Sequence, residues 1–127
     1  MEYKKAVTKI NILIVDDSSE VRNGLHSILS SHADFTIVGE ATDGLDAIDK
    51  AAHLKPDVIL MDAQMPGMNG DKATRRIKDS YPEIKILFLA VHVSDIEEAQ
   101  AAGVDGYLMK DCRRDELLKA IRNVVAD

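Results

Sequence analysis

The sequence predicts an α/β fold in which helices cover both faces of a parallel β-sheet. Segments that look like strands alternate along the chain with segments whose apolar residues recur at helical spacing. Two of the strand-like segments, residues 12–15 and 58–61, are continuously apolar, which is typical of parallel strands buried on both faces. No low-complexity linker or internal repeat interrupts the alternation. We therefore expect a single domain over residues 1–127, with residues 1–8 as a polar N-terminal extension.

The first two βα units are assigned from capping residues and apolar periodicity. Ser18 follows the first strand and is expected to cap a helix, and Asp43 is expected to cap a second helix after a strand at residues 35–40. Each helix has one apolar side that should face the sheet: Val21, Leu25, Ile28 and Leu29 in the first, and Leu45, Ile48, Ala51 and Ala52 in the second. Pro56 ends the second unit before the strand at residues 58–61.

The remaining three units follow the same pattern. Residues 63–70 contain too many breakers for regular structure and should form a loop, after which a helix runs through Ile77. Ser94 is expected to cap a fourth helix, which Gly103 ends. The other elements are expected as strands at residues 84–90 and 106–109 and as helices at residues 95–102 and 114–125. Because crossovers between parallel strands are right-handed, these units predict a flavodoxin-like, doubly wound (βα)5 sandwich with a five-stranded sheet in the order 2-1-3-4-5.

Three carboxylates follow the two buried strands. Asp16 and Asp17 close the first apolar run, and Asp62 closes the run of the third strand. In the predicted order strands 1 and 3 are neighbours, so their carboxyl ends bring these residues together at the crevice where doubly wound sheets bind ligands. Crowded carboxylates repel one another unless a cation offsets their charge, which makes a divalent metal site the first hypothesis. The alternative is that each Asp only caps a helix or starts a turn.

Composition argues against several other classes of protein. The chain has 127 residues and no apolar stretch long enough to span a bilayer or to form the core of a signal peptide, so we expect a cytoplasmic protein with no membrane contact. Its net charge of -6 opposes direct binding of nucleic acid by this domain. The single cysteine, Cys112, excludes an internal disulfide. No glycine-rich phosphate loop follows the first strand, which disfavours dinucleotide and flavin binding.

Four motifs make the sequence similar to the receiver domains of two-component response regulators. They are Val15-Asp16-Asp17, the segment Pro56 to Asp62, the segment Met65 to Gly70 and the segment Gly103 to Lys110, and they spread over nearly the whole chain. Residues 38–41, 43–44 and 116–122 further resemble the subfamily whose output is a C-terminal, LuxR-type helix-turn-helix domain. The resemblance implies a phosphorelay module for transcription regulation. Its implied partners are a histidine kinase, a second copy in a homodimer, and a DNA-binding output domain in the full-length protein.

The resemblance also implies roles for the residues of the crevice. Asp62 is implied as the residue that accepts a phosphoryl group from the kinase as an aspartyl phosphate, and Lys110 as the partner of a phosphoryl oxygen. Mg²⁺ is implied as the cofactor, with Asp17 as a direct ligand and Asp16 as a ligand through water. Asp62 and the backbone carbonyl of Gln64 complete this oxygen-rich set, which suits a hard cation. The chain would then catalyse only its own phosphorylation and dephosphorylation, because no general acid for a phosphatase follows Asp62 at the expected offset.

Ala90 departs from the family pattern, because it stands where a Thr or Ser hydroxyl normally contacts the phosphoryl group. A hydrogen bond to a charged group contributes about 1.5 to 3 kcal/mol, so its loss should weaken the coupling between phosphorylation and the loop after the fourth strand. We expect Asp62 still to accept phosphate. Two alternatives stay open: an interaction module that is switched weakly or not at all by phosphorylation, and an engineered change at Ala90.

Tyr107, three residues before Lys110, matches the aromatic switch position of the family. Because Ala90 is smaller than Thr, space beneath the loop leads to the hypothesis that Tyr107 sits inward even without phosphate. The alternative for Tyr107 is a packed surface aromatic. His92, two positions past Ala90, is expected to be a solvated loop histidine.

Overall fold

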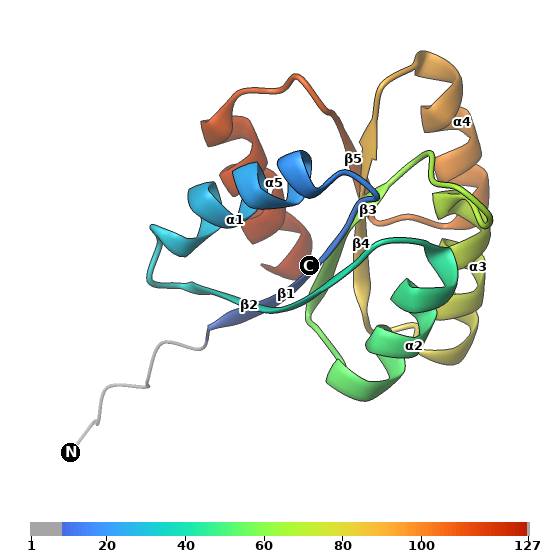
Figure 1. The fold of residues 1–127 in the computed structure, drawn as a ribbon, viewed down its shortest axis with the longest axis horizontal. Coiled ribbons are helices and arrows are strands. Elements are labelled where there is room, and N and C mark those ends of the chain that lie inside the picture. The colour runs from blue at the N-terminus through green and yellow to red at the C-terminus, as the bar shows by residue number, and fades with distance from the viewer. Residues whose placement is uncertain (1–8, 127) are drawn as a thin grey trace.

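The computed structural model describes residues 9–126, and the polar extension expected at residues 1–8 lies outside the described residues. One sheet contains all the strands in the order β2-β1-β3-β4-β5, and every neighbouring pair is parallel, which confirms the predicted topology (Figure 1). The strands are β1 (Ile10–Val15), β2 (Phe35–Ala41), β3 (Val58–Asp62), β4 (Lys85–Ala90) and β5 (Gly106–Met109).

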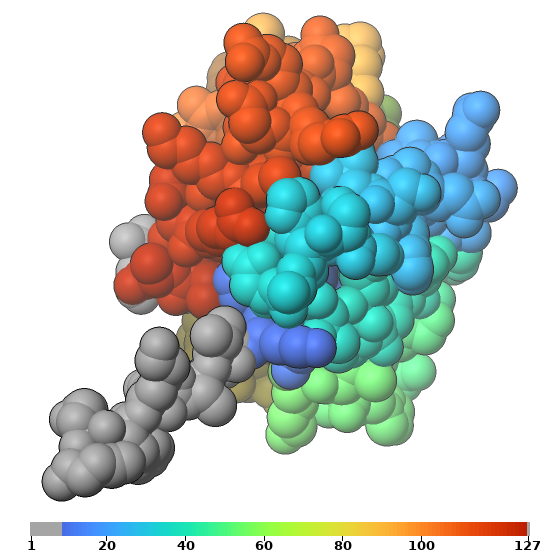
Figure 2. Space-filling model, turned by 90° about the vertical axis from the view of Figure 1, so that its left-hand side faces the viewer, coloured from blue at the N-terminus to red at the C-terminus, as the bar shows by residue number. Residues whose placement is uncertain are grey.

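Helices cover both faces of this sheet. They are α1 (Ser19–Ser30), α2 (Gly44–Leu54), α3 (Gly70–Ser80), α4 (Val93–Ala102) and α5 (Arg114–Ala126). Helices α1 and α5 lie on one face, and α2, α3 and α4 on the other (Figure 1). Seen from the side, α1 in blue and cyan and α5 in red lie next to each other over their face (Figure 2). No helix within residues 9–126 has the length and apolarity that a membrane crossing requires.

Successive side chains of β1 pack into two separate cores. Ile12 and Ile14 belong to the core under α1 and α5, whereas Leu13 and Val15 belong to the core under α2 and α3. All four side chains are buried, so β1 has no solvent-facing side. The continuous apolar run in the sequence is the direct consequence of this two-sided burial.

Two of the predicted helix caps are confirmed. Ser18 is the N-cap of α1, and its hydroxyl accepts the N–H of Val21 at 3.2 Å. Asp43 is the N-cap of α2, and its carboxylate accepts the N–H of Asp46 at 2.8 Å. Each cap satisfies an N–H group that the helix itself leaves without a partner. Each cap lies within three residues of the end of a strand and fixes where the helix begins.

Three details of the sequence prediction are wrong. Ser94 does not cap α4; the N-cap is His92, and Ser94 lies inside the helix because the carboxylate of Asp95 takes over the capping. Leu45 does not face the sheet but is 62% exposed in the first turn of α2. The third helix extends past Ile77 to Ser80, since the N–H of Tyr81 still bonds the carbonyl of Ile77 at 2.7 Å.

Two glycines hold the loop between β3 and α3 close to the sheet. A Cβ on Gly70 would collide with the carbonyl oxygen of Asp62, so only glycine allows α3 to start against the end of β3. A Cβ on Gly44 would lie 2.7 Å from the Cβ of Met68, which is closer than real contacts allow. The loop that follows Asp62 is thereby fixed between the N-terminus of α2 and the end of β3.

Candidate functional site

The acidic residues meet at the carboxyl ends of β1 and β3, as the predicted strand order requires. Val15 pairs with Met61, which places the residues that follow each of them side by side. One carboxylate oxygen from each of Asp16, Asp17 and Asp62 lies within 4.8 Å of the other two. Asp16 and Asp62 are buried at 0% and 2% exposure, whereas Asp17 is exposed. Two buried negative charges and one open to solvent thus share one crevice.

Lys110 lies between the two buried carboxylates. Its Nζ is 2.9 Å from Oδ2 of Asp16 and 2.9 Å from Oδ1 of Asp62. The backbone N–H of Lys110 donates to the carbonyl of Ala90 at 2.8 Å, so the end of β4 orients the residue. Although burial disfavours the ammonium, its close contacts with the carboxylates of Asp62 and Asp16 hold the pKa of Lys110 above its ordinary value. Lys110 therefore carries a positive charge into the crevice at any physiological pH.

Asp62 titrates differently from an ordinary carboxyl group. Its burial, together with repulsion from Asp16, raises the pKa of Asp62, and the hydrogen bonds from Lys110 and from the N–H of Gln64 only partly oppose this. The charged form of Asp62 is therefore less favourable than in water. A further cation that binds near Asp62 would therefore stabilise its ionised form.

The turn after β1 is held by residues that the sequence analysis did not single out. Oδ1 of Asp16 accepts the N–H of Ser18 at 2.9 Å, and its backbone carbonyl accepts Nη1 of Arg22 at 2.7 Å. Nε of Arg22 pairs with Glu40 at the end of β2 at 2.9 Å. Nothing in the spacing of Arg22 and Glu40 along the chain predicts this pair, since their contact depends on how α1 packs beside β2.

The loop after β3 is connected to α4 by a second unpredicted contact. The N–H of Gln64 donates to Oδ1 of Asp62 at 3.3 Å, while its side-chain Nε2 donates to Oδ1 of Asp95 at 2.9 Å. Asp95 is only 2% exposed. Burial opposes its ionisation, but the hydrogen bonds from His92, Gln64 and Val91 together lower the pKa of Asp95. Asp95 is thus a buried charge that is stabilised mainly by hydrogen-bond donors.

Ala90 ends β4 with no exposed surface and with a methyl group as its only side chain. An open cavity of about 170 Å³ lies beside it, lined by Ala90, Val91, Met109, Lys110 and Asp111. The structure therefore has space, but no hydroxyl, at this position. Any coupling from the crevice to the β4–α4 loop must use other groups.

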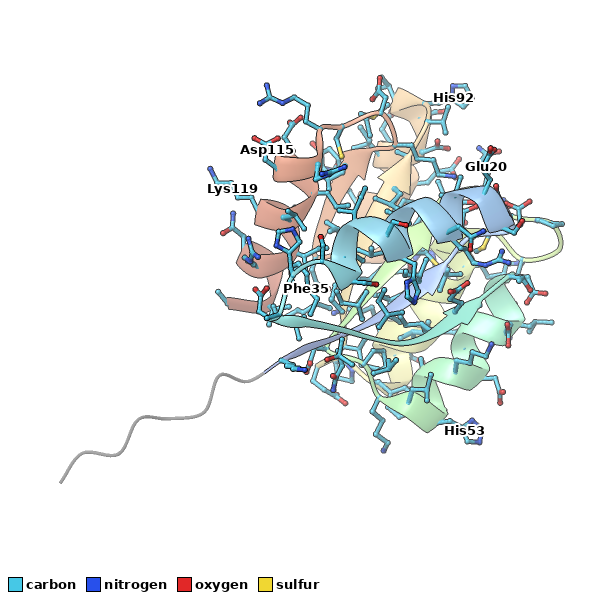
Figure 3. The ribbon with its side chains drawn as sticks, turned by 60° about the vertical axis from the view of Figure 1, so that its left-hand side comes forward. Glu20, Phe35, His53, His92, Asp115 and Lys119 are labelled. Atoms are coloured by element: carbon cyan, nitrogen blue, oxygen red, sulfur yellow. The ribbon has the colours of Figure 1, made fainter. Side chains whose placement is uncertain are left out.

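Two neighbouring residues face solvent. Tyr107 is 44% exposed, so the hypothesis that the smaller Ala90 lets its ring sit inward without phosphate is wrong for this structure. His92 is exposed as expected and points away from the protein at the end of the molecule where Glu20 also lies (Figure 3).

The residues of the crevice suit a hard divalent cation. Oδ2 of Asp16 is buried and accepts no hydrogen bond within the described residues. Its ion pair with Lys110, at 2.9 Å, leaves it able to bind a further cation. The other nearby carboxylates, from Asp17 and Asp62, offer oxygen ligands of the kind that Mg²⁺ prefers. Asp17 is exposed, so a metal ion bound beside it could keep some of its water ligands. The donor set thus fits Mg²⁺ better than it fits a soft metal, which would require thiolate or imidazole ligands.

A (βα)5 sheet in the order 2-1-3-4-5, with an acidic cluster and a lysine at its carboxyl edge, defines the class of signalling receivers. The family model described as "Response regulator receiver domain" matches residues 12–122, and the chain belongs to this family. It is a receiver of two-component signalling.

Known relatives agree with this assignment. The chain is 44% identical over 115 residues to "Response regulator protein VraR" of Staphylococcus saprophyticus, covering 89% of this chain and 55% of that protein. It thus spans about half the length of the curated relatives it matches. A LuxR-family response regulator from Aurantimonas sp. has a similar structure, with a TM-score of 0.88, 30% identity, and coverage of 94% of this chain and 86% of that one.

A third match bears on the metal. The receiver domain of a sensor histidine kinase from Pseudomonas aeruginosa superimposes with a TM-score of 0.85 at 27% identity, covering 94% of this chain and all of that one. That structure is described as having a magnesium ion coordinated in its active-site cleft. The relatives confirm the expected likeness to LuxR-type regulators.

Proposed function

We propose that Asp62 accepts a phosphoryl group from a histidine kinase. The observation that carries this proposal is the burial of its carboxylate between Lys110 and the acidic pair Asp16 and Asp17. An oxygen of Asp62 attacks the phosphorus atom, and the bond from phosphorus to the donor's imidazole nitrogen breaks. The nitrogen keeps the electron pair of that bond, and the product is an acyl phosphate on Asp62. Catalysis consists of positioning and charge neutralisation.

Lys110 supplies the permanent positive charge for this step. It already contacts Oδ1 of Asp62, so its ammonium is placed to pair with an oxygen of the incoming phosphoryl group. Mg²⁺ would be held by Asp17, Asp62 and the backbone carbonyl of Gln64, and by Asp16 through water, and would supply further charge neutralisation. These residues supply no general acid for turnover on other substrates, so the proposed chemistry is limited to the phosphorylation and dephosphorylation of the chain itself.

The proposal is tested by intact mass after incubation with Mg²⁺ and acetyl phosphate. We expect a gain of one phosphoryl group in the unmodified protein and none in Asp62→Asn, which keeps the size of the side chain but is a poor nucleophile. Chelation of Mg²⁺ should abolish the gain. Phosphorylation of Asp62→Asn to the same extent would place the acceptor elsewhere, and no gain in unmodified protein that binds Mg²⁺ would favour the alternative below.

The alternative is an interaction module that responds weakly or not at all to phosphorylation. The observation that favours it is Ala90, which is fully buried and provides no hydroxyl to the crevice. In this case Asp62 could be phosphorylated without any change at the surface of α4 and β5. Partner binding that is equal before and after stoichiometric phosphorylation would support this alternative.

The setting of the domain is proposed from its relatives. We infer that the full-length protein carries a C-terminal, LuxR-type DNA-binding domain and regulates transcription, because LuxR-family regulators are among the matched proteins. We further propose that residues 1–127 form a single receiver domain. We also propose that the protein has a cognate histidine kinase, forms a homodimer and is cytoplasmic. Sedimentation of the chain with and without acetyl phosphate tests the homodimer.

A further inference from the structure

A hydrogen-bonded path leads from Asp62 to the beginning of α4. The N–H of Gln64 donates to Oδ1 of Asp62, and the side chain of Gln64 donates to Oδ1 of Asp95. The other oxygen of Asp95 accepts the N–H groups of Val91 and His92 at 3.2 and 2.9 Å. The loop after β3, which passes beside α4 in Figure 1, and the loop before α4 therefore share one buried carboxylate.

We propose that Asp95 is a positioning residue that acts through Gln64 and couples the state of Asp62 to the first turn of α4. This inference rests on the proposed phosphorylation of Asp62. It supplies a connection between the two loops that does not need a hydroxyl group at Ala90.

Phosphorylation acts first on the contact between Asp62 and Gln64. Conversion of its carboxylate to an acyl phosphate removes the charge from the group that accepts the N–H of Gln64. A neutral carbonyl oxygen is a weaker acceptor than a carboxylate oxygen, so this hydrogen bond weakens. The backbone carbonyl of Gln64 is also a proposed metal ligand. Gln64 is therefore affected both by phosphorylation of Asp62 and by metal binding.

Asp95 depends on Gln64 for one of its hydrogen bonds. Within the described residues, Gln64 is the hydrogen-bond partner of Oδ1 of Asp95, and Asp95 as a residue is 2% exposed. A buried charged acceptor that loses a donor is strongly disfavoured, because water cannot replace the donor there. The carboxylate of Asp95 therefore either moves with Gln64 or changes its hydrogen bonds to Val91 and His92.

The loop before α4 presents two exposed apolar side chains. Val91 is 53% exposed and Val93 is 74% exposed, and both lie where the loop enters α4. The N–H of Val91 is bound to Asp95, so a displacement of that carboxylate alters the backbone that presents these two apolar side chains. The change at Asp62 is in this way converted into a change of an exposed apolar surface.

Hydrogen exchange tests the coupling. Amide exchange of residues 91–102 is measured with Mg²⁺, with and without acetyl phosphate, and compared at equal occupancy of Asp62 as determined by intact mass. We expect exchange in the first turn of α4 to change by about tenfold in the unmodified protein, since local opening reports on the lost hydrogen bonds. Gln64→Ala keeps the backbone N–H and carbonyl, and should lose most of this change.

Two further variants separate coupling from a merely structural effect. Asp95→Asn has a single acceptor oxygen and cannot accept from Gln64 and from the N–H groups of Val91 and His92 at once, so it should lose the response as Gln64→Ala does. Asp46→Asn is the matched control, because Asp46 occupies the first turn of α2 and accepts the N–H of Thr42 at 3.3 Å with no bond to the loop after β3. We expect its response at α4 to equal that of the unmodified protein.

The outcomes distinguish this inference from the proposed function. A response in Gln64→Ala equal to that of the unmodified protein, at equal occupancy, overturns the coupling and leaves the acceptor role of Asp62 intact. A smaller response in Asp46→Asn would also contradict it, because the effect would then follow from helix capping in general. Absence of phosphoryl uptake by the unmodified protein removes both the proposed function and the coupling.

Discussion

Arg22 donates a hydrogen bond from Nη1 to the backbone carbonyl of Asp16 at 2.7 Å. The same guanidinium pairs through Nε with Glu40, so one side chain of α1 joins β2 to the turn that follows β1. Only 16% of the Arg22 side chain is exposed. The backbone of the turn that carries Asp16 is therefore held by a residue that contributes no ligand atom.

Arg22→Gln is expected to weaken both stability and metal binding. Loss of a hydrogen bond to a charged donor costs about 1.5 to 3 kcal/mol in the free energy of unfolding. Because groups that orient metal ligands typically affect affinity by 10 to 100-fold, we expect Mg²⁺ affinity to fall by about tenfold. Calorimetric titration and chemical denaturation measure the two effects. Arg75→Gln, at an exposed position of α3, is the matched control, and an unchanged Mg²⁺ affinity in Arg22→Gln would show that the turn holds its shape unaided.

Asp62→Asn is expected to raise thermal stability at neutral pH when Mg²⁺ is absent. Burial and repulsion from Asp16 raise the pKa of Asp62, so its ionisation favours the unfolded state at every pH above the ordinary value of 3.8. The variant should therefore melt a few degrees higher at pH 7, and the gain should disappear below pH 3.8, where the carboxyl group is protonated in both states. Loss of the Lys110 bond offsets part of this gain.

Thermal melts between pH 3 and pH 7 test this expectation. Glu83→Gln, which removes a charge from an exposed loop, should melt as the unmodified protein does. A lower melting temperature for Asp62→Asn at pH 7 would mean that the ion pair with Lys110 outweighs the burial of the carboxylate.

Asp34→Asn should lower stability at neutral pH by less than about 1 kcal/mol, because the pair it breaks is partly exposed. Hydrogen bonds from Arg122 at 2.8 and 3.1 Å hold the pKa of Asp34 below its ordinary value. The contribution is therefore present above the ordinary pKa and is lost as the pH falls through the lowered one. Arg122 also lies 5.0 Å from the ring centre of Phe35, so Arg122→Gln should cost more than Asp34→Asn. Chemical denaturation at pH 7 and at acid pH compares the two variants; equal costs would show that the ring contact contributes nothing.

The fold was predictable because its signals are local. The apolar runs of β1 and β3 are continuous since both faces of each strand are buried, and their order follows from the handedness of crossovers. The meeting of Asp16 with Asp62 depends only on that order. Lys110 was assigned from resemblance, and its 2.9 Å contacts place it in the same crevice.

The contacts that support the crevice were not predictable, because they join residues that the sequence separates. Gln64 and Asp95 are 31 positions apart, and nothing local distinguishes Asp95 from an ordinary first-turn acid of a helix. Ser94 is the cap that the sequence predicts for α4, because serine is a common cap, yet the backbone enters the helix two residues earlier and uses Asp95 instead. Leu45 satisfies the helical spacing, but it lies beside the buried stripe of α2, which Gly44, Ala47 and Ala51 form.

Ala90→Thr is expected to strengthen the response to phosphorylation. The open cavity of about 170 Å³ beside Ala90 can receive a larger side chain, and a hydroxyl there would donate to a phosphoryl oxygen on Asp62. A charge-assisted hydrogen bond of about 1.5 to 3 kcal/mol corresponds to at least a tenfold change in the ratio of the two conformations. Chemical shifts of Tyr107, which is 44% exposed without phosphate, report whether its ring moves inward after treatment with Mg²⁺ and acetyl phosphate.

Ala90→Val separates the hydroxyl from the added volume, because valine has nearly the shape of threonine but cannot donate a hydrogen bond. We expect Ala90→Val to leave the shift of Tyr107 as it is in the unmodified protein, and Ala90→Thr to enlarge it at equal occupancy of Asp62. Equal enlargement in both variants would indicate that filling the cavity, and not the hydrogen bond, drives the change. No enlargement in either variant would mean that the path through Gln64 and Asp95 carries the response without help from the end of β4.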